Sequence, residues 1–111
     1  AQDAPDPYMS ALHAGMRKRV VREFLLDRLL TFGVVEARAC ERFGLLAEAL
    51  PAGPLKTLYR RLTGAEAQHH ALFVRLARVY FPAAEVGARL DEILAAEADI
   101  VARLPVRAAL H

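Results

Sequence analysis

The stretch that decides the fold runs from residue 34 to residue 69 and reads VVEARACERFGLLAEALPAGPLKTLYRRLTGAEAQH. Its centre, the segment Pro51-Ala52-Gly53-Pro54, is a turn signal, because proline and glycine interrupt helices and Pro54 suits the first position of a new helix. Alanine, leucine, arginine and glutamate dominate the sequence around this turn, and this composition favours helix. The stretch therefore predicts a hairpin of two antiparallel helices.

Three polar residues lie at matching distances from the turn, one before it and two after it. Glu36 precedes Pro51 by about 15 residues and His69 follows Pro54 by about 15, so each lies roughly 22 Å along its helix at ~1.5 Å per residue. Glu66 is three residues before His69, a spacing that puts both side chains on one helix face. We therefore expect two carboxylates and one imidazole to meet at one level of the hairpin.

Apolar side chains repeat at helical spacing, and this repeat predicts the buried face of each helix. Glu36, Glu66 and His69 fall within these apolar stripes. Glu97 is also in phase with its stripe, where we expect either a salt bridge or a contact with a metal-bound histidine. The apolar residues of the three stripes are Leu26, Leu29, Gly33, Ala37, Cys40 and Ala47; Leu55, Leu58, Leu62, Phe73 and Leu76; and Val86, Leu90, Ile93, Ile100 and Leu104.

Polar groups at these positions predict a metal site. An unpaired carboxylate in an apolar interior is costly unless it is neutralised, finds a partner or binds a cation. Carboxylate-rich sites with one imidazole per metal suit iron or manganese, whereas structural zinc prefers thiolate and imidazole. A simpler explanation is also open, in which Glu36 pairs with an arginine and His69 is a hydrogen-bonded core histidine.

The whole sequence predicts an all-α chain, because it contains no strand-like alternation of useful length. Its 111 residues make one domain at most. We expect residues 1–6 to form a linker and helices to span about 7–16, 17–50, 54–80 and 84–104. No apolar run approaches the ~18 residues that a membrane span needs. A single cysteine, Cys40, excludes an intrachain disulfide and suits the reducing cytoplasm.

Basic residues cluster in two places, although the net charge of +2 does not by itself indicate a nucleic-acid partner. Such clusters either keep a protein soluble or bind phosphates, and the second role predicts binding that depends steeply on salt. The candidate phosphate-binding residues are Arg17, Lys18, Arg19, Arg22 and Arg60.

The remaining polar residues receive simpler predictions. We expect Cys40 to be a small core residue, and His70 to lie at the surface or behind the metal ligands. His13 and His111 are expected to face solvent. We expect a solvated or salt-bridged flank made of Asp27, Arg38, Glu41 and Arg42. Within this flank, Arg38 is a candidate partner of the metal site.

Beyond these patterns, two strings resemble a known family. They are VVEARACERFGLLA, residues 34–47, and LYRRLTGAEAQHHALFVRLARVYFP, residues 58–82. Both are similar to the C-terminal half of the tRNA 2-methylthio-isopentenyladenosine hydroxylase family (MiaE), and the similarity covers roughly residues 22 to 104. The resemblance implies a ferritin-like antiparallel helical bundle that holds two iron ions, of which this chain has the second half. It also implies O₂-dependent hydroxylation of the isopentenyl group on the hypermodified adenosine beside the tRNA anticodon, with an unidentified electron donor.

The resemblance assigns the three polar residues of the hairpin. Glu36 matches the carboxylate ligand of the family's third core helix, and Glu66 and His69 match the Glu-x-x-His of the fourth. The family's other Glu and other Glu-x-x-His lie on two earlier helices that this sequence lacks, so either a preceding half or a second copy must complete the site. The alternative function is a ferritin-like metal-binding oxidase or storage protein, or a non-catalytic helical module, without an RNA partner.

Overall fold

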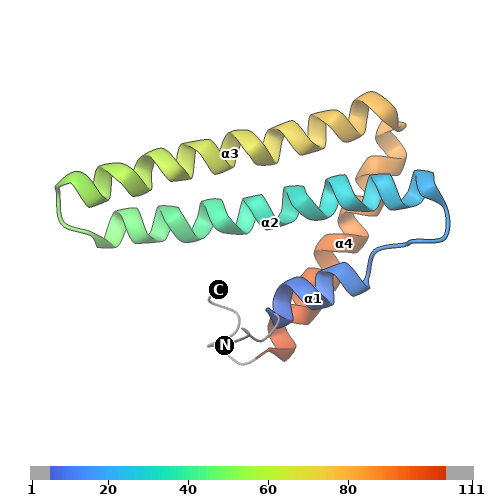
Figure 1. The fold of residues 1–111 in the computed structure, drawn as a ribbon, viewed down its shortest axis with the longest axis horizontal. Coiled ribbons are helices and arrows are strands. Elements are labelled where there is room, and N and C mark those ends of the chain that lie inside the picture. The colour runs from blue at the N-terminus through green and yellow to red at the C-terminus, as the bar shows by residue number, and fades with distance from the viewer. Residues whose placement is uncertain (1–5, 105–111) are drawn as a thin grey trace, which may run out of the picture.

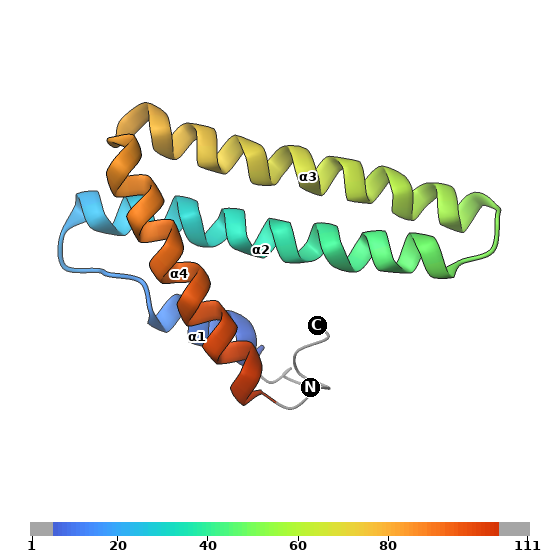
Figure 2. The same cartoon turned by 180° about the vertical axis from the view of Figure 1, so that it is seen from behind.

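The computed structural model describes residues 6–104, and these residues form four α-helices (Figure 1). The helices are α1 (Pro7–Ala14), α2 (Val21–Ala49), α3 (Pro54–Tyr80) and α4 (Ala83–Arg103). The long helices α2 and α3 form an antiparallel hairpin, α4 turns back across it, and α1 packs against α4 (Figures 1 and 2). The all-α class and the hairpin are therefore confirmed. Residues 1–5 of the expected linker, and His111, lie outside the described part of the chain.

The turn between α2 and α3 has the chemistry that its sequence predicts. Gly53 has a φ of 153°, a conformation that residues with a side chain rarely adopt, and Pro54 occupies the first turn of α3. Lys56 Nζ donates a hydrogen bond of 2.9 Å to the carbonyl oxygen of Leu50, which would otherwise be an unpaired group at the end of α2. The turn thereby sets the height at which residues of the two helices face each other.

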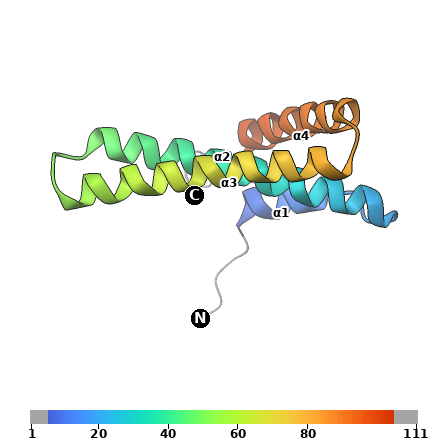
Figure 3. The same cartoon turned by 90° about the horizontal axis from the view of Figure 1, so that it is seen from above.

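The apolar core lies at the other end of the hairpin, where α4 crosses α2 and α3 (Figures 1 and 3). No helix among residues 6–104 covers the hairpin near the turn, because α1 and α4 both lie toward the opposite end. Those same described helices include none that is both long enough and apolar enough to cross a membrane. The fully or nearly buried residues of the core are Leu26, Leu30, Val34, Ala77, Phe81, Val86 and Ile93.

Two residues of the predicted α3 stripe are not buried. Leu55 is 52% exposed and Leu58 is 48% exposed, although both are in phase with the inward face of α3. The physical reason is that only α2 and α3 are present near the turn within residues 6–104, and two helices alone cannot enclose a core. Leu45 and Leu46 of α2 are exposed in the same region. The hairpin thus presents an apolar surface near the turn.

The second helix begins later than its sequence predicts. A helix from residue 17 would place several cations in its first turn, where the positive end of the helix dipole disfavours them. In the structure, α2 begins at Val21, and the segment before it is bound by a side chain of α2. The backbone N–H of Arg17 donates a 2.9 Å hydrogen bond to Asp27 Oδ2, which keeps this segment out of the helix. The first helix likewise ends at Ala14, before Gly15.

Candidate metal centre

The structure brings together the three residues that the sequence predicts as metal ligands. One potential ligand atom from each of Glu36, Glu66 and His69 lies within 4.8 Å of the other two. His69 Nδ1 is 3.8 Å from Glu36 Oε2 and 3.8 Å from Glu66 Oε2, which is too long for a hydrogen bond. Within residues 6–104, no other group of three such side chains converges in this way.

The environment of Glu66 fits a cation. Its Oε2 atom is buried and accepts no hydrogen bond from any described residue, which is an unfavourable state for a carboxylate oxygen. The side chains of Glu66 and Glu36 are 19% and 28% exposed, and that of His69 is 55% exposed. Two partly buried carboxylates beside an imidazole form an oxygen-rich donor set, which suits iron or manganese better than structural zinc. The residues present therefore fit a metal ion.

Two aromatic pairs flank the three ligands along the hairpin. The rings of Phe32 and Phe73 lie 5.8 Å apart between centroids, one helical turn from the ligands on the side of the apolar core. The rings of Phe43 and Tyr59 lie 5.8 Å apart on the side of the turn. Contacts between such rings stabilise the packing of α2 against α3. The hairpin therefore holds the polar cluster between two apolar layers.

The burial of some polar side chains differs from the prediction. Cys40 is half-buried rather than a core residue, and its Sγ lies 3.4 Å from the carbonyl oxygen of Thr63 in α3. His70 is also half-buried, and its Nδ1 lies 2.7 Å from the carbonyl oxygen of Gly33. His13 is half-buried instead of solvent-facing, because α1 packs against α4.

Glu97 forms the salt bridge that was one of its two predicted roles. It is buried and accepts hydrogen bonds from Arg38 Nε at 2.8 Å and Nη2 at 2.6 Å. The Tyr8 hydroxyl donates a third hydrogen bond, of 2.5 Å, to Glu97 Oε2. Burial, reinforced by the Glu97 carboxylate, raises the pKa of Tyr8 well above its usual range. Arg38 also pairs with Glu41 at 2.8 Å, so the expected salt-bridged flank exists there and joins α2 to α4 and α1.

Asp27 is a buried anchor that the sequence does not reveal. The salt-bridged role that we expected as one of two alternatives is confirmed, since Asp27 is ion-paired with both Arg17 and Arg89, each at 2.7 Å, but Asp27 is 0% exposed and does not lie on a surface flank. Burial alone would raise the pKa of Asp27, but hydrogen bonds from Arg89 and Arg17 outweigh it and hold the pKa well below its usual range. Arg89 comes from α4 and Arg17 from the segment before α2. One carboxylate therefore joins three parts of the chain.

The five candidate phosphate-binding residues lie in two groups at opposite ends of the hairpin (Figure 1). Arg17 is ion-paired with Asp27 and Glu23, and Arg22 is ion-paired with Glu85. Engaged arginines have fewer donors left for a phosphate. The exposed residues of the set are Lys18, Arg19, Arg22 and Arg60.

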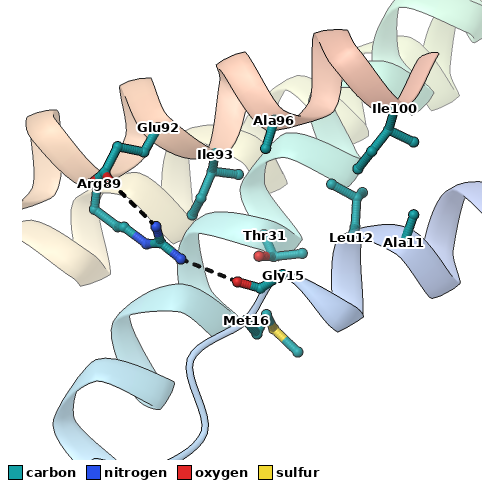
Figure 4. A pocket seen from close by; sticks show the side chains of 10 residues that line it. All are labelled: Ala11, Leu12, Gly15, Met16, Thr31, Arg89, Glu92, Ile93, Ala96 and Ile100. Carbon is teal, nitrogen blue, oxygen red and sulfur yellow. Dashed lines mark hydrogen bonds and ion pairs between the residues drawn. The ribbon is translucent and has the colours of Figure 1, made fainter. Parts of the chain in front are cut away.

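Two hollows accompany these features, and neither is lined by a proposed ligand. The first, of about 80 Å³, lies between α1, α2 and α4, where Arg89 donates to the carbonyl oxygen of Gly15 (Figure 4). It is too small for a nucleoside, because ligand pockets usually measure about 300–1,000 Å³. The second, of about 430 Å³, lies near the turn and is lined partly by Lys56 and Arg60.

Comparisons with known proteins agree with the geometry. A family model described as tRNA-(MS[2]IO[6]A)-hydroxylase (MiaE) matches residues 2–111. A Pseudomonas putida protein named tRNA 2-(methylsulfanyl)-N(6)-isopentenyladenosine(37) hydroxylase is 30% identical over 99 residues, which cover 86% of this chain and 48% of that protein. A Salmonella typhimurium protein of the same name is 36% identical over 77 residues, which cover 69% of this chain and 28% of that protein.

A solved structure is similar in fold. It is titled "Protein 43 with aldehyde deformylating oxygenase activity from Synechococcus", and it aligns with a TM-score of 0.83 and 31% identity. The alignment covers 96% of this chain and 52% of that protein. This similarity confirms the predicted ferritin-like helical class. The chain therefore spans about half, or less, of the length of each protein that it matches.

Proposed function

The chain belongs to the MiaE family of tRNA hydroxylases, and from this premise we propose that Glu36, Glu66 and His69 are its share of a di-iron hydroxylation site. The observation that carries the proposal is the buried Oε2 of Glu66, which accepts no hydrogen bond from the described residues and lies in a cluster of two carboxylates and one imidazole. Ferritin-like di-iron proteins use one Glu from each of two helices and one Glu-x-x-His from each of the other two. The hairpin supplies half of that set.

Each residue of the cluster has a distinct task in this site. Glu36 and Glu66 would contribute two negative charges that offset the charge of the cations, and their partial burial strengthens that attraction. His69 would contribute a neutral nitrogen ligand from its imidazole. The aromatic pairs on either side would limit the access of water to the ligands.

The chemistry of the bound iron completes the proposed reaction. Held by these residues, iron would supply monooxygenase chemistry, in which O₂, two electrons from an external donor and two protons place one oxygen atom in a C–H bond of the substrate and release the other as water. The proposed substrate is the isopentenyl group on the hypermodified adenosine beside the tRNA anticodon, since the names of both curated relatives contain isopentenyladenosine(37). Such a base lies in a single-stranded loop, where unstacked bases are accessible to a protein. A tRNA substrate would place the reaction in the cytoplasm.

The remaining iron ligands would come from outside these 111 residues. The chain spans 48% of one curated relative and 52% of the similar solved structure. Exposed apolar residues on the hairpin, including Leu55 and Leu58, provide a surface on which two further helices would pack. A preceding segment or a second copy of this chain are the two possible sources. Two iron ions per polypeptide would indicate the first source, and one iron ion per polypeptide in a dimer would indicate the second.

Product analysis with tRNA tests the proposed function. The protein, expressed from its complete reading frame, would be loaded anaerobically with Fe²⁺ and given O₂, dithionite with a mediator, and tRNA that carries 2-methylthio-isopentenyladenosine. We expect nucleosides from the digested tRNA to gain one oxygen atom, as measured by mass spectrometry. Glu66→Gln should abolish this product, whereas Glu48→Gln, a matched change on the exposed surface of α2, should retain it.

The same experiment distinguishes the proposed tRNA hydroxylase from the alternative function. Bound iron with no hydroxylated nucleoside would favour a ferritin-like oxidase or storage protein that has no RNA partner. The similar solved structure, whose title gives it aldehyde deformylating oxygenase activity, makes an oxidase with another substrate a specific alternative. A protein that binds no iron would contradict both functions.

A further inference from the structure

Two hydrogen bonds between the hairpin helices bracket the proposed metal ligands. On one side, His70 Nδ1 of α3 lies 2.7 Å from the carbonyl oxygen of Gly33 in α2. On the other side, Cys40 Sγ of α2 lies 3.4 Å from the carbonyl oxygen of Thr63 in α3. Both bonds join a side chain to the backbone of the opposite helix. They therefore oppose sliding of α2 along α3 at the level of the ligands.

The His70 bond fixes where that imidazole carries its proton. A carbonyl oxygen only accepts hydrogen bonds, so the Nδ1 of His70 must carry the hydrogen. An oxygen atom in a helix can accept this bond in addition to the one from the N–H four residues later, because it has two lone pairs. The Nδ1 of His70 is therefore engaged with α2. His70 lies about 100° around the helix from His69, and it is not part of the ligand cluster.

The helices approach closely where this bond forms. Gly33 is buried, and a Cβ atom at this position would lie 3.5 Å from Phe73 Cβ and 3.7 Å from His70 Nδ1. Both distances are ordinary van der Waals contacts, so the backbone of α2 lies close to the imidazole and still has room for a methyl group at this position. A shift of α3 by one residue would move its side chains by ~1.5 Å along the axis and rotate them by about 100°. Such a shift would separate His69 from Glu36.

We propose that His70 is a positioning residue, whose hydrogen bond to the Gly33 carbonyl sets the α2–α3 register at which Glu36, Glu66 and His69 converge. This inference rests on the proposed metal site. Because His70 follows His69 directly, a bond that fixes one histidine restricts the other. The hydrogen bond from Cys40 to the Thr63 carbonyl, on the opposite side of the ligands, is longer and has a weak thiol donor. It therefore restrains the position of α2 relative to α3 less strongly.

Two matched variants separate the hydrogen bond from the bulk of the side chain. In His70→Asn, the amide nitrogen can occupy the position of Nδ1 and donate to the Gly33 carbonyl. In His70→Gln, the amide lies one bond farther out, near the position of Nε2, and the donor at the Nδ1 position is lost. The protein from its complete reading frame would be titrated with Co²⁺ by visible absorption, with helicity checked by circular dichroism. The ring ¹⁵N chemical shifts of metal-free wild-type protein would identify the tautomer of His70.

The proposal expects an Nδ1–H tautomer, Co²⁺ binding by His70→Asn close to that of wild type, and binding by His70→Gln weakened about 10–100-fold at unchanged helicity. An Nε2–H tautomer, or equal Co²⁺ affinities for the two variants, would overturn the positioning role while leaving the metal site intact. Wild-type protein that binds no Co²⁺ would instead overturn the proposed metal site on which the inference rests.

Discussion

Replacement of Asp27 by asparagine is the sharpest test of how the fold holds its hairpin in place. Asp27 Oδ1 accepts hydrogen bonds from Arg17 Nε, Arg17 Nη2 and Arg89 Nε. Its Oδ2 accepts from the Arg17 backbone N–H, Arg17 Nε and Arg89 Nη2. An amide NH₂ at either position would face several donors and no acceptor, so Asp27→Asn removes the charge and also creates repulsive contacts.

The structure sets the size of the expected loss. Breaking a buried ion pair by removing one partner costs about 3–5 kcal/mol. Arg89 has a side chain only 16% exposed and would stay largely desolvated, whereas that of Arg17 is 35% exposed and can be rehydrated. We therefore expect Asp27→Asn to lower the free energy of unfolding by about 3 kcal/mol, at the lower end of that range. The melting temperature would fall by roughly 12–24 °C for a domain of this size.

Urea unfolding followed by circular dichroism measures this loss. The matched control is Glu85→Gln, which breaks the exposed pair between Glu85 and Arg22 and should leave the melting temperature nearly unchanged. If Asp27→Asn unfolds at the same urea concentration as Glu85→Gln, then the buried carboxylate does not stabilise the fold as argued.

Three further changes test other parts of the structure. Tyr8→Phe removes the hydrogen bond to buried Glu97 and should lower the free energy of unfolding by about 1.5 kcal/mol in urea titrations; no change would mean that the bond is not maintained in solution. Gly33→Ala should keep or slightly raise the melting temperature, whereas Gly33→Leu should lower it by overpacking, and equal melting temperatures would contradict the close approach. Because the folded-state pKa of Asp27 is depressed, its stabilisation is present above its unfolded pKa of about 3.9 and is lost as pH falls through the folded value. Urea titrations from pH 6 to pH 2 should therefore show a steeper loss of stability for wild type than for Asp27→Asn below about pH 4, and parallel curves would refute the assignment.

The hairpin and its polar cluster were predictable because local signals determine them. The PAGP turn fixes where the helices meet, and constant helical rise then fixes which residues face each other. Equal distances from the turn predict that Glu36 lies level with Glu66 and His69, and the structure places the three side chains together. The assignment of these residues to a metal remains a prediction, since their convergence alone does not identify the cation.

Other features depend on contacts between distant parts of the chain and could not be predicted from local patterns. Asp27 resembles a surface residue in sequence, because nothing near it indicates that Arg89, far along the chain, will reach it from α4. The prediction that Leu55 and Leu58 are buried is wrong for the described residues, because helical spacing shows only which face of α3 is apolar. Burial, however, also requires a partner surface, and residues 6–104 provide none near the turn.

Both arms of the hairpin are proposed to hold one metal site. Diffraction at the iron absorption edge would locate the metal in crystals of the protein from its complete reading frame, after an anaerobic soak in Fe²⁺. We expect an anomalous difference peak within bonding distance of the carboxylates of Glu36 and Glu66 and the imidazole of His69. Iron bound elsewhere, or no anomalous signal at these three side chains, would contradict this proposal.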